Sequence, residues 1–135
     1  MSAAPEEFHG AARGGVRTLL RVEGLAVLLA SILFFQMRHG RWSIFALLFF
    51  APDLSFVLYA IDRKLATAGY NAMHSYVLPA ALLCLGLLHP AVTPYALIWT
   101  AHIGFDRALG YGLKYTTGFG DTHLGTLGKP GTEKI

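Results

Sequence analysis

Four long apolar runs constrain this chain more than any other feature of its sequence. They cover residues 22–37, 43–61, 70–89 and 92–113. The hydrocarbon core of a bilayer is about 30 Å thick and takes about 20 apolar residues as a helix. The composition agrees, because 54% of the residues are hydrophobic and 14% are charged, unlike a soluble domain of this size. The runs therefore predict an integral membrane protein whose partner is the lipid bilayer.

The segments between the runs are too short to hold a second folded unit, and one connector is expected at residues 62–69. The sequence predicts one all-α domain over residues 1–135, a four-helix transmembrane bundle with short loops. The first run is the shortest, so a tilted or interfacial helix is the alternative to a full span. Residues 1–12 and 126–135 are small, polar and rich in Gly and Pro, and we expect mobile tails there.

The positions of Lys and Arg predict the orientation, because cytoplasmic loops are enriched in these residues. With four spans, the termini and the second loop share one side, and the opposite side carries Arg38 and Arg41. Both termini are therefore expected in the cytoplasm, with the chain in the cell (inner) membrane. The net charge of +3 is then a consequence of this topology. The sequence has no basic stripe with interleaved aromatic residues, so it does not indicate nucleic acid as a partner. The shared side carries the larger set: Arg13, Arg17, Arg21, Arg63, Lys64, Lys114, Lys129 and Lys134.

Ionisable residues lie inside three of the four runs. They are Asp53, His74, His102 and Asp106. A charged Asp at the centre of a bilayer costs upward of about 2.5 kcal/mol, so each group requires a partner or a function. At 1.5 Å of rise per residue, all four fall in the cytoplasmic half of the bilayer in the predicted orientation. We expect them to form one polar pocket open to the cytoplasm.

The spacing of these residues predicts which faces meet. His102 and Asp106 are four residues apart and lie on one side of a helix. Asn71, His74 and Ser75 are three and four residues apart and are expected on a matching polar face of the third run. Pro52 frees a backbone carbonyl before Asp53, a local break that membrane helices tolerate where protein or water covers it.

Two imidazoles and two carboxylates support three kinds of chemistry. They are ligands for Zn²⁺, Mn²⁺ or Fe²⁺, and helix bundles commonly build metal sites from facing helices. They can also perform acid–base catalysis or relay a proton. A structural hydrogen-bond network that fixes helix packing is the third reading. Our hypothesis gives catalytic and divalent-metal-ligating roles to all four: Asp53, His74, His102 and Asp106.

Three sequence blocks, FFAPDLSFVLYA, YNAMHSYVLP and AHIGFDRALGYGLKYTTGFGDTHLG, resemble the blocks of a bacterial family named domain of unknown function 4260. The resemblance covers roughly residues 44–125 and implies a small four-helix integral membrane protein without an established activity. Ser75 and the Thr-Thr-Gly-Phe-Gly segment depart from the commoner forms of the blocks. The ionisable positions inside the blocks are intact: Asp53, His74, His102, Asp106, Arg107, Asp121 and His123.

The end of the third block adds candidate substrate-binding residues. Arg107 is rotated by about 100° from Asp106 on a helix and is available for a headgroup phosphate or an ion pair. The glycines of GFGDTHLG are expected to turn the chain, so that Asp121 and His123 fold back and close the mouth of the pocket. The GYG at residues 110–112 sits at the end of a predicted helix, where its glycines are expected to allow close helix packing or to end the helix.

By analogy alone, YNAMHSY is similar to the His-Ser motifs of small inner-membrane metal-dependent hydrolases. The analogy suggests a metal-dependent membrane hydrolase that acts on a lipid or a small anionic phosphoester. A non-catalytic membrane scaffold and a small proton-coupled carrier are the alternatives. Four short helices leave little room for alternating access unless the protein forms a homodimer, which the sequence leaves open.

Overall fold

The computed structural model describes residues 10–126, which are mostly helical. The five α-helices are α1 (Gly14–Met37), α2 (Trp42–Leu48), α3 (Arg63–His74), α4 (Val77–Leu88) and α5 (Thr93–Leu109). Two 3₁₀ helices are η1 (Ala51–Ala60) and η2 (Pro90–Val92). A small antiparallel hairpin follows α5 and consists of β1 (Asp121–Thr122) and β2 (Gly125–Thr126), with Asp121 opposite Thr126.

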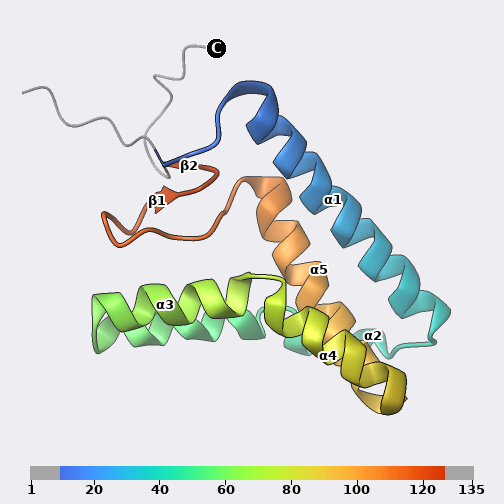
Figure 1. Cartoon of the computed structure of the whole chain (residues 1–135). Coiled ribbons are helices and arrows are strands. Elements are labelled where there is room, and N and C mark those ends of the chain that lie inside the picture. Colours follow the sequence, from blue (N-terminus) through green and yellow to red (C-terminus); the bar gives the residue numbers. More distant parts are fainter. Residues whose placement is uncertain (1–9, 127–135) are drawn as a thin grey trace, which may run out of the picture.

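Helix α5 is the centre of the arrangement (Figure 1). Helix α1 runs antiparallel beside it, α4 also packs on α5, and α3 projects sideways together with η1. Both the β-hairpin and the beginning of α1 lie at the end of the molecule where α5 terminates. The C-terminal end of α3 therefore meets the middle of α5, and this junction carries the candidate site.

Glycines allow α1 and α5 to approach closely. A Cβ atom on Gly104 would lie 2.7 Å from the Gly24 carbonyl oxygen and 2.7 Å from the Leu28 nitrogen, so no side chain fits there. Small residues at such contacts are how helices in membranes bring their backbones together. Farther along the same seam, Phe35 of α1 packs with Leu97 and Ile98 of α5 in an apolar cluster.

Several helices have the length and composition of membrane spans. Gly14–Met37 and the continuous stretch Trp42–Ala60 each meet the criterion, and the pair α3 and α4, bent by 41°, supplies a third if it forms one span. Helix α5 has 17 residues and is not among these candidates. Large apolar side chains of α1, such as Leu29 and Leu33, are more than half exposed. These apolar helices indicate a membrane protein.

The structure corrects the boundaries of two predicted runs. The second run is interrupted after α2, and η1 begins with Pro52 at its second position, in agreement with the predicted proline break. The predicted connector at residues 62–69 is wrong, because the Asp62 side chain caps α3 by accepting a hydrogen bond from the Leu65 N–H at 2.9 Å. Asn71 and His74 both lie in α3, but Ser75 does not continue their predicted polar face, because α3 ends at His74 and Ser75 is extended.

The end of α5 confirms the role assigned to the first glycine of GYG. Gly110 has a φ of 91° and donates its N–H to the Arg107 and Asp106 carbonyls, which terminates the helix. The chain then folds back toward the start of α1, where the Ala12 N–H donates to the His123 carbonyl at 2.7 Å. Residues 10–12 of the predicted N-terminal tail thus contact the C-terminal segment. The rest of the predicted tails, residues 1–9 and 127–135, lies outside the described residues.

Candidate metal centre

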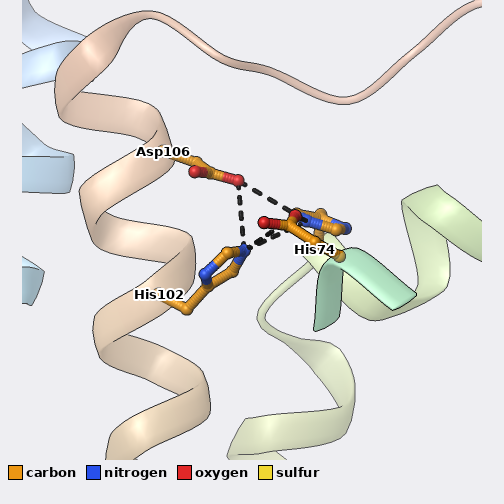
Figure 2. A group of neighbouring side chains, drawn as sticks. His74, His102 and Asp106 are labelled. Atoms are coloured by element: carbon orange, nitrogen blue, oxygen red, sulfur yellow. Dashed lines mark hydrogen bonds and ion pairs between the residues drawn. The ribbon is translucent and has the colours of Figure 1, made fainter. Parts of the chain in front are cut away.

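The four predicted residues converge on one point. One donor atom each from Asp53, His74, His102 and Asp106 lies within 4.8 Å of all the others. His74 Nε2 lies 3.0 Å from Asp53 Oδ1 and 3.5 Å from Asp106 Oδ2. His102 Nε2 lies 3.3 Å from each of the same two oxygens and 3.2 Å from His74 Nε2. Figure 2 shows the two imidazoles and the Asp106 carboxylate pointing toward one another.

Three elements supply these side chains. One face of α5 presents His102 and Asp106, η1 supplies Asp53, and His74 is the last residue of α3. Two hydrogen bonds hold the end of α3 against α5: Trp99 Nε1 donates to the Met73 carbonyl at 2.7 Å, and Arg107 Nη2 donates to the His74 carbonyl at 3.1 Å. The backbone that carries His74 is therefore fixed relative to α5.

The imidazole of His74 has a defined orientation. Its Nδ1 lies 2.9 Å from the Tyr70 carbonyl, and its ring stacks on the Tyr70 ring with centroids 3.9 Å apart. A carbonyl can only accept, so Nδ1 carries a proton and Nε2 of the neutral ring presents a lone pair to the cluster. This pattern, with one ring nitrogen bonded to a backbone carbonyl and the other directed at the site, is typical of metal-ligating histidines.

His102 is oriented differently. Its ring is fully buried and makes edge contacts with Phe49 and Phe50. Within residues 10–126, its Nδ1 is buried and has no hydrogen-bond partner. Packing rather than a second hydrogen bond therefore sets the direction of this imidazole.

The cluster is buried on three sides and open on one. His74 and His102 are buried, and the side chain of Asp106 is 15% exposed, whereas that of Asp53 is 34% exposed. The opening thus lies at Asp53, on the side of η1. A small molecule that reaches the cluster would meet this carboxylate first.

Most of the distances between the donor atoms match those of a tetrahedral metal site. Ligand bonds of about 2.0–2.1 Å to Zn²⁺ imply donor atoms about 3.3 Å apart at the corners of a tetrahedron. Five of the six distances between the four donor atoms fall between 3.0 and 3.5 Å. The sixth distance, between the Asp53 and Asp106 oxygens, is below 4.8 Å, so the four donor atoms can surround a small divalent ion.

The structure places the other three candidate residues outside the cluster. Arg107 is buried, and its Nη1 lies 3.3 Å from both ring nitrogens of His123. The C-terminal segment folds back, as expected, but it brings His123 to Arg107 and not to the cluster, so closure of the pocket mouth stays a prediction. Asp121 accepts a hydrogen bond from the Thr117 hydroxyl at 2.8 Å, within its own turn. A substrate-binding role for these residues stays a prediction.

Lys114 supports the site from the C-terminal segment, and the sequence analysis assigned it no such role. Its Nζ lies 3.3 Å from the Phe119 ring centroid and 4.8 Å from that of Tyr70, the residue that stacks on His74. Asn71 pairs with the Lys114 backbone through two hydrogen bonds of 2.7 Å. Burial lowers the pKa of Lys114 to about 8. A lysine between aromatic residues far apart in the sequence gives no local signal, so only the fold reveals this contact.

These observations define a mostly helical protein with apolar helices and a buried histidine–aspartate cluster of metal-site geometry. Residues 17–127 match the family described as "Domain of unknown function (DUF4260)", and the chain belongs to that family. No curated protein and no solved structure matches the chain. The predicted family membership is thus confirmed, and the activity has to be argued from the cluster itself.

Proposed function

We propose that this protein is a membrane metalloenzyme that binds one divalent metal, such as Zn²⁺ or Mn²⁺, and hydrolyses a phosphoester of a lipid or a small molecule. The observation that carries the proposal is the convergence of two imidazole nitrogens and two carboxylate oxygens, drawn from η1, α3 and α5, within 4.8 Å of one another. Mixed nitrogen and oxygen donors of this kind suit Zn²⁺, Mn²⁺ and Fe²⁺.

Electrostatics supports a cation at this point. Asp53 and Asp106 bring two negative charges to a largely buried site, and the Nε2 lone pair of neutral His74 points toward both. Like charges and lone pairs that face one another in a buried site destabilise it unless a cation lies between them. A divalent ion held by the enclosed donors would also neutralise the charge of the nearby Asp53 carboxylate, whereas protons on the imidazoles satisfy the cluster in part.

The burial pattern suggests different roles for the two carboxylates. His74, His102 and Asp106 are the more enclosed donors and supply a three-residue ligand set, which leaves a coordination position open in the manner of catalytic zinc sites. Asp53 lies at the opening and is suited to accept a proton from an attacking water. A metal held there supplies Lewis-acid activation of that water.

The membrane setting suggests where the substrate comes from. We take the apolar helices as a four-span bundle with both termini in the cytoplasm, which places the cluster in the cytoplasmic half of the bilayer. The contact between Ala12 and His123 supports termini on one side. A reporter fused to the C-terminus should be active in the cytoplasm, and activity at the outer face would reverse the orientation.

Metal content is the decisive measurement. Protein purified in mild detergent without chelators should contain about one equivalent of Zn²⁺ or Mn²⁺ by elemental analysis. His102→Ala should lose the metal and lower the apparent melting temperature, because the two carboxylates remain buried without compensation. His89→Ala is the matched control, since this histidine is exposed and lies outside the cluster. A wild type without metal, and without stabilisation on adding Zn²⁺ or Mn²⁺, contradicts the proposal and favours a packing network or proton relay.

The two aspartates separate catalysis from binding. Asp106→Asn should lower metal affinity, by about 10- to 100-fold if it behaves as a ligand or an orienting group. Asp53→Asn should retain the metal and lose metal-dependent cleavage of a chromogenic phosphate mono- or diester. If the wild type is fully loaded with metal but cleaves neither the phosphate monoester nor the diester, the hydrolase proposal is wrong. A metal-binding scaffold is then the remaining function.

A further inference from the structure

A second cavity lies beside α1 and has no part in the cluster. It has a volume of about 500 Å³, and its lining includes Leu20, Glu23 and Val27 from α1. Arg107 of α5 and Tyr76, between α3 and α4, complete its polar wall together with His123. The cavity thus combines apolar side chains of a candidate membrane span with a small set of polar groups, as ligand sites commonly do.

The polar wall of this cavity contains two hydrogen-bond donors, Arg107 and Tyr76, that have no anionic partner among the described residues. Arg107 is 8% exposed, and its described partners are the His74 carbonyl and the ring of His123, so no carboxylate within residues 10–126 forms an ion pair with it. The Tyr76 hydroxyl is buried beside the Arg107 guanidinium, and among the described residues it has no partner with full hydrogen-bond geometry. A buried guanidinium without a counter-ion is unfavourable, and an anion in the cavity would stabilise it.

His123 provides a third donor. Its Nδ1 accepts the Leu113 N–H at 2.8 Å, so the proton of the neutral ring is on Nε2. Burial and the neighbouring Arg107 lower the pKa of His123 below its ordinary value, so the ring is neutral near pH 7. The cavity therefore presents a guanidinium, a hydroxyl and an imidazole N–H, a set that suits a phosphate group.

Glu23 adds the opposite charge. It is the acidic residue of α1 and lines the same cavity as Arg107, with which it forms no ion pair in the part of the chain that the structure describes. A carboxylate and a guanidinium that share a cavity without pairing are complementary to a ligand that carries both charges. The apolar residues Leu20 and Val27 beside them suit an acyl chain.

We propose that this cavity binds a zwitterionic phospholipid, with the headgroup phosphate on Arg107, Tyr76 and His123 and the headgroup amine on Glu23. The cavity is distinct from the cluster, because none of the four cluster residues lines it. Arg107 lines the cavity and also donates to the His74 carbonyl. Its occupant is a membrane lipid rather than a soluble phosphate, since the lining belongs to an exposed apolar helix.

Lipid-dependent thermal stability of delipidated protein in detergent tests this site. Phosphatidylethanolamine should raise the apparent melting temperature by several degrees, and more than phosphatidylglycerol, which has the phosphate but no amine. Glu23→Gln should remove the preference between the two lipids. Tyr76→Phe should weaken binding of both by about 10-fold, the effect of one hydrogen bond to a charged group. Both substitutions are conservative and leave the hydrogen bonds of Arg107 to the His74 carbonyl and to His123 in place.

Asp53→Asn is the matched control, because it also removes one negative charge but lies in the cluster. It should retain the full preference for phosphatidylethanolamine, whether or not the protein binds metal. Equal stabilisation of wild type by the two lipids, or an unchanged preference in Glu23→Gln, overturns the proposal. Soluble phosphoethanolamine should stabilise far less than the lipid at equal concentration, and equal stabilisation would overturn the assignment to a membrane lipid.

Discussion

Helices α1 and α5 lie side by side but differ in both hydropathy and burial. Helix α1 is 24 residues long and strongly apolar, yet it buries only Gly24, Ser31 and Phe35 among its residues, all of which the structure describes. Helix α5 is 17 residues long, carries His102, Asp106 and Arg107, and is buried along most of its length. The more apolar helix is thus the more exposed one.

The difference shows what apolar composition means in this chain. In a bilayer, exposed positions contact hydrocarbon, so α1 is apolar where it faces outward. Polar and ionisable groups are stable only where other helices cover them, and α5 packs against α1, α4, α2 and η1. Burial rather than hydropathy therefore distinguishes α5, the helix that carries the ionisable residues.

The seam between the two helices gives the largest expected effect. Gly104→Val should destabilise the protein by about 3 kcal/mol or more, because the new side chain would collide with the backbone of Gly24 and Leu28. Thermal unfolding in detergent measures the change. The matched control is Gly15→Val, since a Cβ on Gly15 meets nothing within 4 Å. A stable Gly104→Val protein would show that α1 is not held closely against α5.

The segment after α5 gives an intermediate effect that depends on pH. Burial lowers the pKa of Lys114 to about 8, below the value of about 10.4 for an unfolded chain. Between these values the unfolded state binds the proton more strongly, so stability should rise with pH from about 8 to about 10, by about 1–2 kcal/mol. The neighbouring aromatic rings favour the ammonium and reduce the effect.

Melting temperatures of wild type and Lys114→Met across this pH range isolate the contribution. The difference between the two proteins should change with pH, whereas Lys64→Met, at an exposed lysine of α3, should follow wild type. Parallel curves for wild type and Lys114→Met would mean that Lys114 is hydrated in solution and that the C-terminal segment does not cover it.

The outer face of α1 gives the smallest effect. Leu33 is 58% exposed, and Leu33→Ala should change the free energy of unfolding by no more than about 0.5 kcal/mol. The measurement is again thermal unfolding in detergent, with Leu29→Ala as a second exposed position. A loss of about 2 kcal/mol would contradict an exposed α1 and indicate that a second copy of the chain covers this face.

Sequence alone determined the class of the protein and the members of the cluster. Long apolar runs predict membrane helices because backbone groups in hydrocarbon must bond within one segment. Asp53, His74, His102 and Asp106 stand out because ionisable groups at such depth are costly. The convergence of these four residues was predicted from depth and helical periodicity, and the structure confirms it.

Tertiary structure decided where the helices break and what each polar group contacts. The start of α3 at Arg63 depends on the Asp62 cap, a signal present in the sequence that the hydropathy of the runs obscured. The pairing of Arg107 with His123, and the position of Lys114 against Tyr70, depend on how the chain folds back after Gly110. Contacts between segments distant in the sequence leave no periodic pattern, because they are set by packing across helices rather than along one.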